Sequence, residues 1–320
     1  MTVSTWILQR YLCSSGPLKG TWDLARKLAV RLLNDPACEF EIHGKRLRMP
    51  LSHKLPIYLK DCPLYDRLPQ RLGAYASQKH GLLKCIDVGA NIGDTIAALR
   101  QSESDAFLAI EPNPHFRRYL ESNWGSDGNV TILPLICSRD DGTGAVEIRE
   151  VNGTASIVSR AGSCEIERKP LDRIVAEHPL FARPDIVKVD TDGHDFEVIT
   201  GARNVLSESK PILLFECASF SDGNYLRECL QVLALLKECG YGHFILYDNV
   251  GNMFGCYSLS DLGPFKNLLF YQMTSDFCYF DILVMRDEDL FEFYKLEVDF
   301  ITTQMKDRAL TGSALAASEL

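Results

Sequence analysis

Residues 87–95 read Asp-Val-Gly-Ala-Asn-Ile-Gly-Asp-Thr and come at the end of an apolar run, residues 83–88, where a helical pattern begins. The glycines at positions 89 and 93 let the backbone turn sharply and approach a ligand closely. A turn from a strand into a helix also presents free backbone N–H groups at its edge. The stretch therefore predicts the first strand, turn and helix of a Rossmann-like fold, with a cofactor at the turn.

The spacing of the two glycines indicates which cofactor to expect. The pattern is D-x-G-x-x-x-G, which lacks the first glycine pair of the G-x-G-x-x-G motif that accommodates a dinucleotide pyrophosphate. S-adenosylmethionine (SAM) has no phosphate, and its ammonium group can meet a nearby carboxylate. We expect SAM contacts from Asp87, Gly89, Ala90, Asn91, Gly93 and Thr95. A tight turn with a purely structural role would show the same letters.

A second acidic residue follows the next apolar run. Glu111 comes after Phe-Leu-Ala-Ile at 107–110, about 20 residues beyond the glycines, where a carboxylate can accept both ribose hydroxyl groups. The alternative is a helix cap or a solvent-facing acid ahead of Pro-Asn-Pro at 112–114. Together with the glycine turn, the ribose role is favoured. Pro112, and Ser138 near the adenine, complete the predicted cofactor contacts.

Short aliphatic runs alternate with helical stretches after Gly81, which predicts a parallel sheet with helices on both faces. Helices should begin near Asp94, Pro114, Phe196 and Asn224. We expect seven strands, near 83–88, 107–110, 130–136, 186–190, 212–216, 244–248 and 280–285. Between the third and fourth strands, the range 142–164 is rich in Gly and Ser and predicts an inserted hairpin and loop. The fold class is thus α/β, with a mostly parallel sheet.

The segment before this sheet has a different pattern. Apolar residues between Thr21 and Leu33 follow helical spacing, with basic residues mostly on the other side, which predicts an amphipathic basic helix. Gly44 stands between two alternating runs and predicts a hairpin. We therefore divide the chain into an N-terminal accessory helix and hairpin segment (1–80), a main domain (81–300) and a flexible tail (301–320).

Charge is unevenly distributed along the 320 residues, which carry a formal net charge of −9. There are 14 Lys and Arg residues against 6 Asp and Glu residues up to Lys84, and 20 against 37 after it. The acidic main domain disfavours a groove for duplex nucleic acid. The basic helix could contact an anionic membrane peripherally, but a helix docked on its own domain is favoured. The sequence leaves open whether the chain forms a homo-oligomer.

The 11 cysteines form no C-x-x-C pair and no Cys/His cluster with zinc-ligand spacing. Several lie inside apolar runs, as Cys85 does, which indicates free, buried thiols in a reducing compartment. No apolar run approaches the roughly 20 residues needed to span a bilayer, and the first residues lack the pattern of a signal peptide. We expect a cytoplasmic protein.

Four stretches of the sequence resemble the FkbM family of methyltransferases. They are residues 86–95, 111–114, 186–202 and 211–216, and the third is the most specific. Asp192 and Asp195 stand where the family usually has glutamates. The resemblance covers residues 83–285 and extends loosely to 51–56 and 65–66. It implies a class I methyltransferase fold, SAM as the methyl donor and a hydroxyl acceptor on a sugar, a lipid-linked glycan or a macrolide.

The third stretch also holds the predicted catalytic residues, Asp190 and His194. Both come at the carboxyl end of a strand, where open α/β sheets bind ligands. Methyl transfer depends on positioning, and an alcohol acceptor also has to lose its proton. Either residue could be the base, because His titrates near neutral pH and neighbouring carboxylates raise one another's pKa. Local capping is the alternative for each. Asp192 and Glu216 are predicted to bind the acceptor.

The acids of this region allow one further possibility. Mg²⁺ or Ca²⁺ could take oxygen ligands from Asp190, Asp192, Asp195 and Glu216. Two of these acids could instead cap the helix that begins at Phe196, and no metal is assigned. Two other functions stay open beside O-methylation: a nicotinamide-dependent oxidoreductase built on the same turn, and a non-catalytic SAM-binding partner protein.

Overall fold

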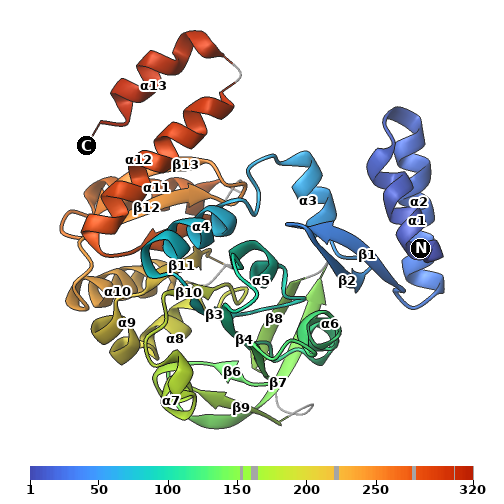
Figure 1. The fold of residues 1–320 in the computed structure, drawn as a ribbon, viewed down its shortest axis with the longest axis horizontal. Coiled ribbons are helices and arrows are strands. Elements are labelled where there is room, and N and C mark those ends of the chain that lie inside the picture. The colour runs from blue at the N-terminus through green and yellow to red at the C-terminus, as the bar shows by residue number, and fades with distance from the viewer. Residues whose placement is uncertain (152–153, 160–164, 220–222, 276–278, 306, 320) are drawn as a thin grey trace.

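The computed structural model describes residues 1–151, 154–159, 165–219, 223–275, 279–305 and 307–319. Its centre is an eight-stranded sheet with the order β13-β12-β14-β11-β10-β3-β4-β5 (Figure 1). The strands are β3 (Lys84–Val88), β4 (Ala106–Ile110), β5 (Val130–Leu133), β10 (Ile186–Val189), β11 (Ile212–Cys217), β12 (His243–Asp248), β13 (Met253–Ser258) and β14 (Phe280–Val284). The five neighbouring strands β11, β10, β3, β4 and β5 run parallel. Strand β14 is antiparallel to both β11 and β12.

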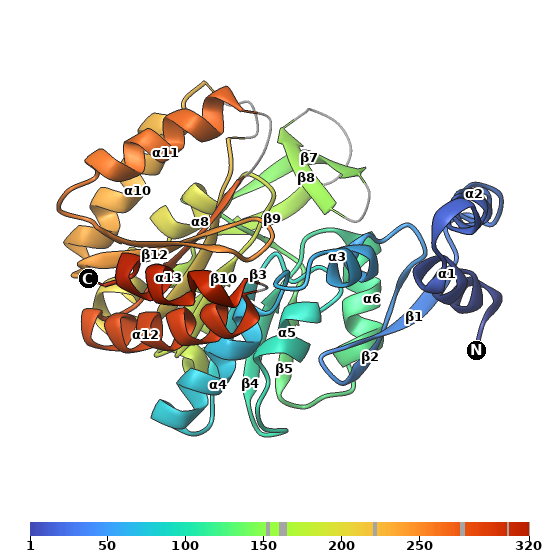
Figure 2. The same ribbon diagram turned by 90° about the horizontal axis from the view of Figure 1, so that it is seen from above.

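Helices cover both faces of this sheet because its strands are apolar on both sides. Every residue of β4 and β11 is buried, as expected of a sheet between two layers. One layer contains α4 (Leu68–His80), α5 (Asp94–Leu99), α6 (Pro114–Trp124) and α12 (Asp287–Gln304). The other contains α7 (Leu171–Glu177), α8 (Asp195–Thr200), α9 (Arg203–Ser209), α10 (Tyr225–Glu238) and α11 (Gly263–Thr274). In Figure 2, α10 and α11 lie on one side of the strands, and α4, α5 and α12 lie on the other.

The predicted α/β fold class is confirmed by this sheet and its two helical layers. In the strand order, β4 and β5 follow on one side of β3. The next strand of this sheet along the chain, β10, pairs with the other side of β3. The sheet has an eighth strand, β13, beyond the seven predicted. Its sequence, Met-Phe-Gly-Cys-Tyr-Ser, contains a glycine and no regular alternation of apolar and polar residues.

A smaller sheet with the order β6-β9-β7-β8 lies beyond the third strand. It contains β6 (Ile136–Cys137), β7 (Gly142–Val151), β8 (Thr154–Ser159) and β9 (Glu165–Lys169). The antiparallel pairing of β7 and β8 confirms the predicted inserted hairpin, of which residues 152–153 and 160–164 lie outside the described residues. Pro134, which has no N–H to donate, follows β5, so the third strand is shorter than predicted.

The N-terminal segment forms α1 (Val3–Cys13), α2 (Gly16–Leu32), β1 (Ala37–Ile42), β2 (Lys45–Pro50) and α3 (Leu55–Asp61). β1 and β2 pair as the predicted hairpin, and Gly44 in its turn has a φ of 77°. The division of the chain at residue 80 stays a prediction. One apolar core includes Leu47 of the hairpin, Leu72 of α4 and Phe107 of β4, so the segment packs continuously against the main sheet.

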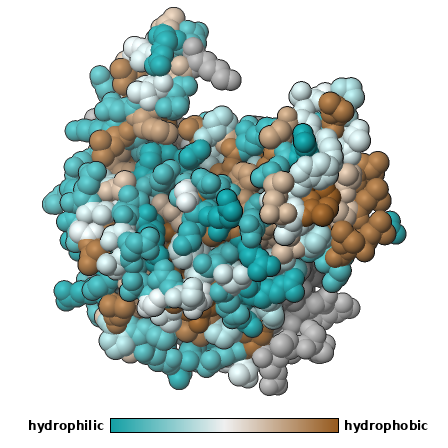
Figure 3. All heavy atoms as spheres, turned by 45° about the vertical axis from the view of Figure 1, so that its right-hand side comes forward, coloured by the Kyte–Doolittle hydropathy of each residue, from teal (hydrophilic) through white to brown (hydrophobic). Residues whose placement is uncertain are grey.

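Helix α2 confirms the predicted amphipathic helix and adds an unexpected orientation. Arg26 and Ala29 are its buried residues, and Trp22 packs edge-on against Trp6 of α1 at 5.0 Å between ring centroids. Four leucines on another side of α2 are between 47% and 73% exposed: Leu18, Leu24, Leu28 and Leu32. In Figure 3 apolar residues gather at the end of the molecule where α1 and α2 lie.

An ion pair joins α4, early in the chain, to α12, near the end of the main sheet's helices. Arg71 of α4 donates to Glu297 of α12, with 2.7 Å between Arg71 Nη2 and Glu297 Oε2. The hydroxyl of Tyr247 donates to the same carboxylate at 3.0 Å. Helix α13 (Thr311–Ala317) follows, so the range predicted as a tail contains a helix.

The described cysteines are all free, while Cys164 and Cys278 lie outside the described residues. Among the described residues, the helices are all too short or too polar to cross a membrane.

Candidate functional site

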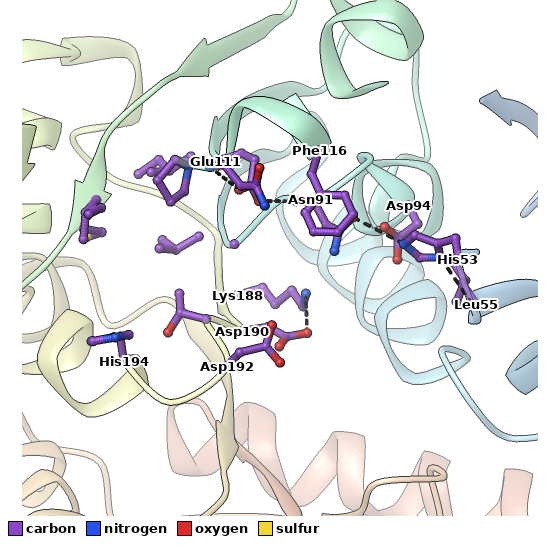
Figure 4. Close-up of a pocket in the computed structure, with 18 of the residues that line it drawn as sticks. His53, Leu55, Asn91, Asp94, Glu111, Phe116, Lys188, Asp190, Asp192 and His194 are labelled. Carbon is purple, nitrogen blue, oxygen red and sulfur yellow. Dashed lines mark hydrogen bonds and ion pairs between the residues drawn. The ribbon is translucent and has the colours of Figure 1, made fainter. Parts of the chain in front are cut away.

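A cavity opens where the carboxyl ends of β3, β4 and β10 meet, next to the point at which the sheet order reverses. Such switch points are where open α/β sheets bind ligands. The cavity is lined by the β3–α5 turn, by residues 110–113 after β4, by Ile136 and Cys137, and by residues 190–194 after β10. Figure 4 shows side chains from all of these loops converging on it.

The β3–α5 turn has the conformation that its two glycines predict. Gly89 and Gly93 both have a φ of 84°, and the N–H groups of Gly89 and Ala90 donate to the Ile110 carbonyl at 2.9 and 3.1 Å. A Cβ on Gly89 would lie 1.8 Å from the Asp190 carbonyl oxygen, and one on Gly93 would lie 2.4 Å from the Trp124 ring. The glycines are therefore required by contacts within the protein, before any ligand is considered.

Glu111 holds the turn by both carboxylate oxygens. Oε2 accepts from the Asn91 N–H at 2.8 Å, and Oε1 accepts from the Asn113 N–H at 2.7 Å. The residue is 5% exposed, so it is not a solvent-facing acid, and burial raises its pKa to about 7. Each oxygen keeps a further lone pair for a ligand, because a carboxylate accepts about four hydrogen bonds.

The predicted cofactor residues fall into two groups. Gly89, Asn91, Glu111 and Pro112 line the cavity. The residues that do not line it are Asp87, Ala90, Gly93, Thr95 and Ser138. The buried Asp87 carboxylate lies 3.9 Å from Lys188 Nζ, so it faces strand β10. Burial raises the pKa of Asp87 to about 6. Thr95 lines a neighbouring cavity, and the Ser138 hydroxyl donates to the Asp140 carbonyl.

One wall of the cavity comes from the N-terminal segment, which the sequence reasoning did not assign to the site. His53, Lys54, Leu55, Tyr58 and Tyr65 line it. His53 Nδ1 accepts from the Leu55 N–H at 3.3 Å, and Nε2 lies 3.4 Å from the Asn91 side-chain oxygen. Burial lowers the pKa of His53 to about 4, so its ring is neutral and donates from Nε2. The sequence signal that could have indicated this wall is the loose likeness of residues 51–56 and 65–66 to the FkbM family.

The opposite wall carries the predicted catalytic residues. Asp192, two residues after Asp190, has a φ of 50°. The carboxylates of the two residues lie side by side in Figure 4. Lys188 donates to Asp190 Oδ2 at 3.0 Å; it lines the cavity and was not predicted as a site residue. His194 also lines the cavity and begins α8 through its backbone, while its side chain makes no capping hydrogen bond to the helix.

Asp195 and Glu216 lie behind this loop and have separate roles. Asp195 Oδ2 accepts from the Thr191 hydroxyl at 2.9 Å, and Oδ1 accepts from the Glu216 N–H at 3.3 Å, so Asp195 holds the loop to β11. The Glu216 side chain lines a second cavity, which shares Lys188 and Asp190 with the first. Burial, and then the nearby charge of Asp190, raise the pKa of Glu216 well above its usual range.

Acids outnumber cations around the first cavity. Asp94, Glu111, Asp190 and Asp192 line it, against Lys54 and Lys188. Burial also raises the pKa of Asp94 to about 7. The cavity therefore favours a ligand with positive charge and disfavours one with negative charge.

Residues 87–242 match the family model described as the methyltransferase FkbM domain, which confirms the resemblance for this range. Hexuronic acid methyltransferase AglP of Haloferax volcanii is 36% identical over 125 residues, which are 38% of this chain and 50% of the relative. The chain thus spans about half the length of the curated relative that it matches.

Two solved structures are similar at lower identity. Methyltransferase FkbM from Methylobacillus flagellatus KT shares 18% identity with a TM-score of 0.37, over 53% of this chain and 44% of that one. TYW2 of M. jannaschii, solved with AdoMet, shares 12% identity with a TM-score of 0.37, over 78% of this chain and 86% of that one. At these TM-scores the fold class is better supported by the strand order itself.

We expect Gly89→Ala to lower the free energy of unfolding by at least about 1 kcal/mol more than Gly44→Ala does, the lower end of the cost of overpacking. Both glycines have a positive φ, so both variants bear the strain of a left-handed backbone. A Cβ at Gly44 has no atom within 4 Å, whereas one at Gly89 meets the Asp190 carbonyl. Urea unfolding measures both variants, and equal losses would show that the close approach at Gly89 is not a constraint.

Proposed function

Because residues 87–242 match the FkbM methyltransferase domain, we propose that the chain is a SAM-dependent O-methyltransferase whose acceptor is a hydroxyl group of a sugar or glycan. The observation that carries the proposal is the acidic cavity at the switch point of the sheet. SAM has a sulfonium and an ammonium group against one carboxylate, so its net charge is positive. A nicotinamide dinucleotide brings an anionic pyrophosphate, which the same acids would repel.

In the proposed complex, SAM lies across the ends of β3 and β4. Its ribose hydroxyls donate to Glu111, and its adenine lies toward Ile136 and Cys137, which line the same cavity. Asn91 and Gly89 approach the cofactor through the turn. This arrangement is supported by the two lone pairs that Glu111 retains after it accepts from Asn91 and Asn113.

Methyl transfer then takes place beside the 190–194 loop. The acceptor oxygen attacks the methyl carbon in line with the breaking carbon–sulfur bond, whose electron pair returns to sulfur, and S-adenosylhomocysteine leaves. The hydroxyl proton passes to a base, for which we propose Asp190, with His194 as the alternative on the same cavity wall. Lys188 fixes the Asp190 carboxylate by its ion pair.

The relative named for hexuronic acid methylation favours a sugar acid as the acceptor. Tyr58 and Tyr65 line the cavity with ring centroids 5.2 Å apart and offer aromatic faces to a sugar ring. Lys54 on the same wall offers a cation to an acceptor carboxylate. We propose Asp192 and Glu216 as further acceptor contacts. We propose that the reaction takes place in the cytoplasm, which the free cysteines expected from the sequence support.

We also propose that α2 lies on an anionic membrane surface through its exposed leucines. Lys27 and Arg31 are exposed next to Leu24 and Leu28 on the helix, so cationic and apolar groups would reach the lipid headgroups together. The excess of Lys and Arg up to Lys84 supports the choice of lipid as the occupant.

Glu111→Gln should make SAM affinity less dependent on pH. With its pKa at about 7, Glu111 is mostly protonated at pH 6 and ionised at pH 8, and only the ionised form accepts from both ribose hydroxyls. The wild-type affinity should fall about tenfold from pH 8 to pH 6. Asp94 titrates in the same cavity, so the difference between the wild type and the variant in calorimetric titrations is the decisive quantity. Identical pH profiles would remove Glu111 from the ribose contacts.

Asp190→Asn should leave SAM binding nearly intact and slow methyl transfer at least about 10²-fold, the low end of general base contributions. The substitution keeps the size of the side chain and removes its charge. Transfer of labelled methyl groups from SAM to glycans with and without hexuronic acid measures the rate, and thermal shifts with SAM and with NAD test the cofactor. Wild-type turnover in Asp190→Asn would refute this base, and a loss in His194→Gln alone would assign the role to His194.

The double variant Leu24→Ser/Leu28→Ser should bind vesicles of anionic phosphatidylglycerol at least about tenfold more weakly than the wild type, since burying one leucine contributes about 1.5–3 kcal/mol. Cosedimentation measures binding, with neutral phosphatidylcholine vesicles as the lipid control. Leu180→Ser is the matched protein control, because Leu180 is exposed elsewhere on the surface. Concentration-dependent self-association that the double variant abolishes, without vesicle binding, would replace the membrane by a second copy of the chain.

A further inference from the structure

Three carboxylates from two neighbouring strands meet at the edge of the sheet. Asp190 and Asp192 follow β10, and Glu216 lies near the end of β11. One carboxylate oxygen from each of the three lies within 4.8 Å of the other two. Oxygen atoms around a divalent cation at 2.0–2.6 Å are typically separated by about 3–4 Å, so small side-chain movements would bring all three to one ion.

Glu216 supplies a second observation that does not depend on the clustering. The residue is 7% exposed, and its Oε2 has no hydrogen-bond partner among the described residues. A buried polar atom without a partner is costly. Native proteins rarely leave such an atom unpaired unless it has a ligand or a functional role.

The other charged groups nearby do not provide that partner. Asp195 is already used by Thr191 and by the Glu216 N–H, so its two oxygens hold the loop. Lys188 donates to Asp190 Oδ2 and lies 3.9 Å from Asp87, on the side of β3. Asp281 stands opposite Glu216 on β14 and adds a further carboxyl group to the second cavity.

We propose that Asp190, Asp192 and Glu216 bind one hard divalent cation, of the class of Mg²⁺, Mn²⁺ or Ca²⁺. These ions prefer carboxylate oxygens, and none of the three residues offers the sulfur or nitrogen that softer metals select. The cation would satisfy Glu216 Oε2 and compensate the excess negative charge of the loop. The site goes beyond the proposed function, since the ion would bind whether or not methyl groups are transferred.

The test is a titration of the full chain, stripped of metal by chelation and dialysis, with MnCl₂ in the absence of SAM. Electron paramagnetic resonance counts bound Mn²⁺, and calorimetry repeats the titration with MgCl₂ and CaCl₂. We expect one saturable site. No binding up to about 10 mM, weaker than the weakest protein calcium sites, would overturn the proposal.

The variants assign the site to its residues. Glu216→Gln and Asp192→Asn should each weaken Mn²⁺ binding at least about tenfold, because affinity depends on the number of charged ligands. Glu197→Gln is the matched control: this acid lies on α8, directly after the loop, and pairs with Arg139 at 3.1 Å, so the variant should bind Mn²⁺ like the wild type. Asp190 is also the proposed catalytic base, so it is not substituted in this experiment.

The possible results of these titrations distinguish between a cation at this site, a cation elsewhere and no bound cation. If Glu216→Gln does not fold, Asp192→Asn on the cavity wall decides alone. Binding that is unaffected by both variants, or equally weakened in Glu197→Gln, would place the ion elsewhere and overturn the site. Methyl transfer measured in parallel separates the two hypotheses: turnover without any metal binding refutes the cation site and leaves the proposed function standing.

Discussion

The absence of a side chain at Gly89 is the constraint on which the cavity depends. The Asp190 carbonyl occupies the place where a Cβ would lie, so the turn after β3 and the loop after β10 are in direct contact. The Asp190 N–H also donates to the Val88 carbonyl at 2.9 Å. This contact places the Asp190 side chain across the cavity from Glu111, so the two halves of the sheet present their acids to the same space.

The N-terminal segment completes that space from outside the sheet. His53 lies next to Asn91, and Tyr58 and Tyr65 line the same cavity. The turn therefore lies between Glu111 on one side and a neutral histidine on the other. Burial on this side lowers the local dielectric constant, which strengthens the electrostatic effect of each acid that stays ionised. This arrangement supports the proposed binding of a cationic methyl donor.

Sequence reasoning predicted the part of the site that local chemistry determines. The glycine turn, Glu111 and the 190–195 loop could be located because strand ends and glycine spacing are readable along the chain. Asp87 and Ser138 were predicted as contacts, but whether a residue faces the cavity or the neighbouring strand depends on register. The His53 wall and Lys188 were missed, because their roles arise from contacts between distant segments and from pairing between β3 and β10.

The ion pair between Arg71 and Glu297 joins residues 226 positions apart. On the ribosome, at roughly 5–20 residues per second, Arg71 would wait about 10–45 s before its partner is synthesised. During that time α4 lacks α12, whose Phe293 packs edge-on against Tyr75 of α4 in the folded protein. The apolar side of α4 that α12 covers in the folded protein therefore stays exposed to solvent until α12 has been synthesised.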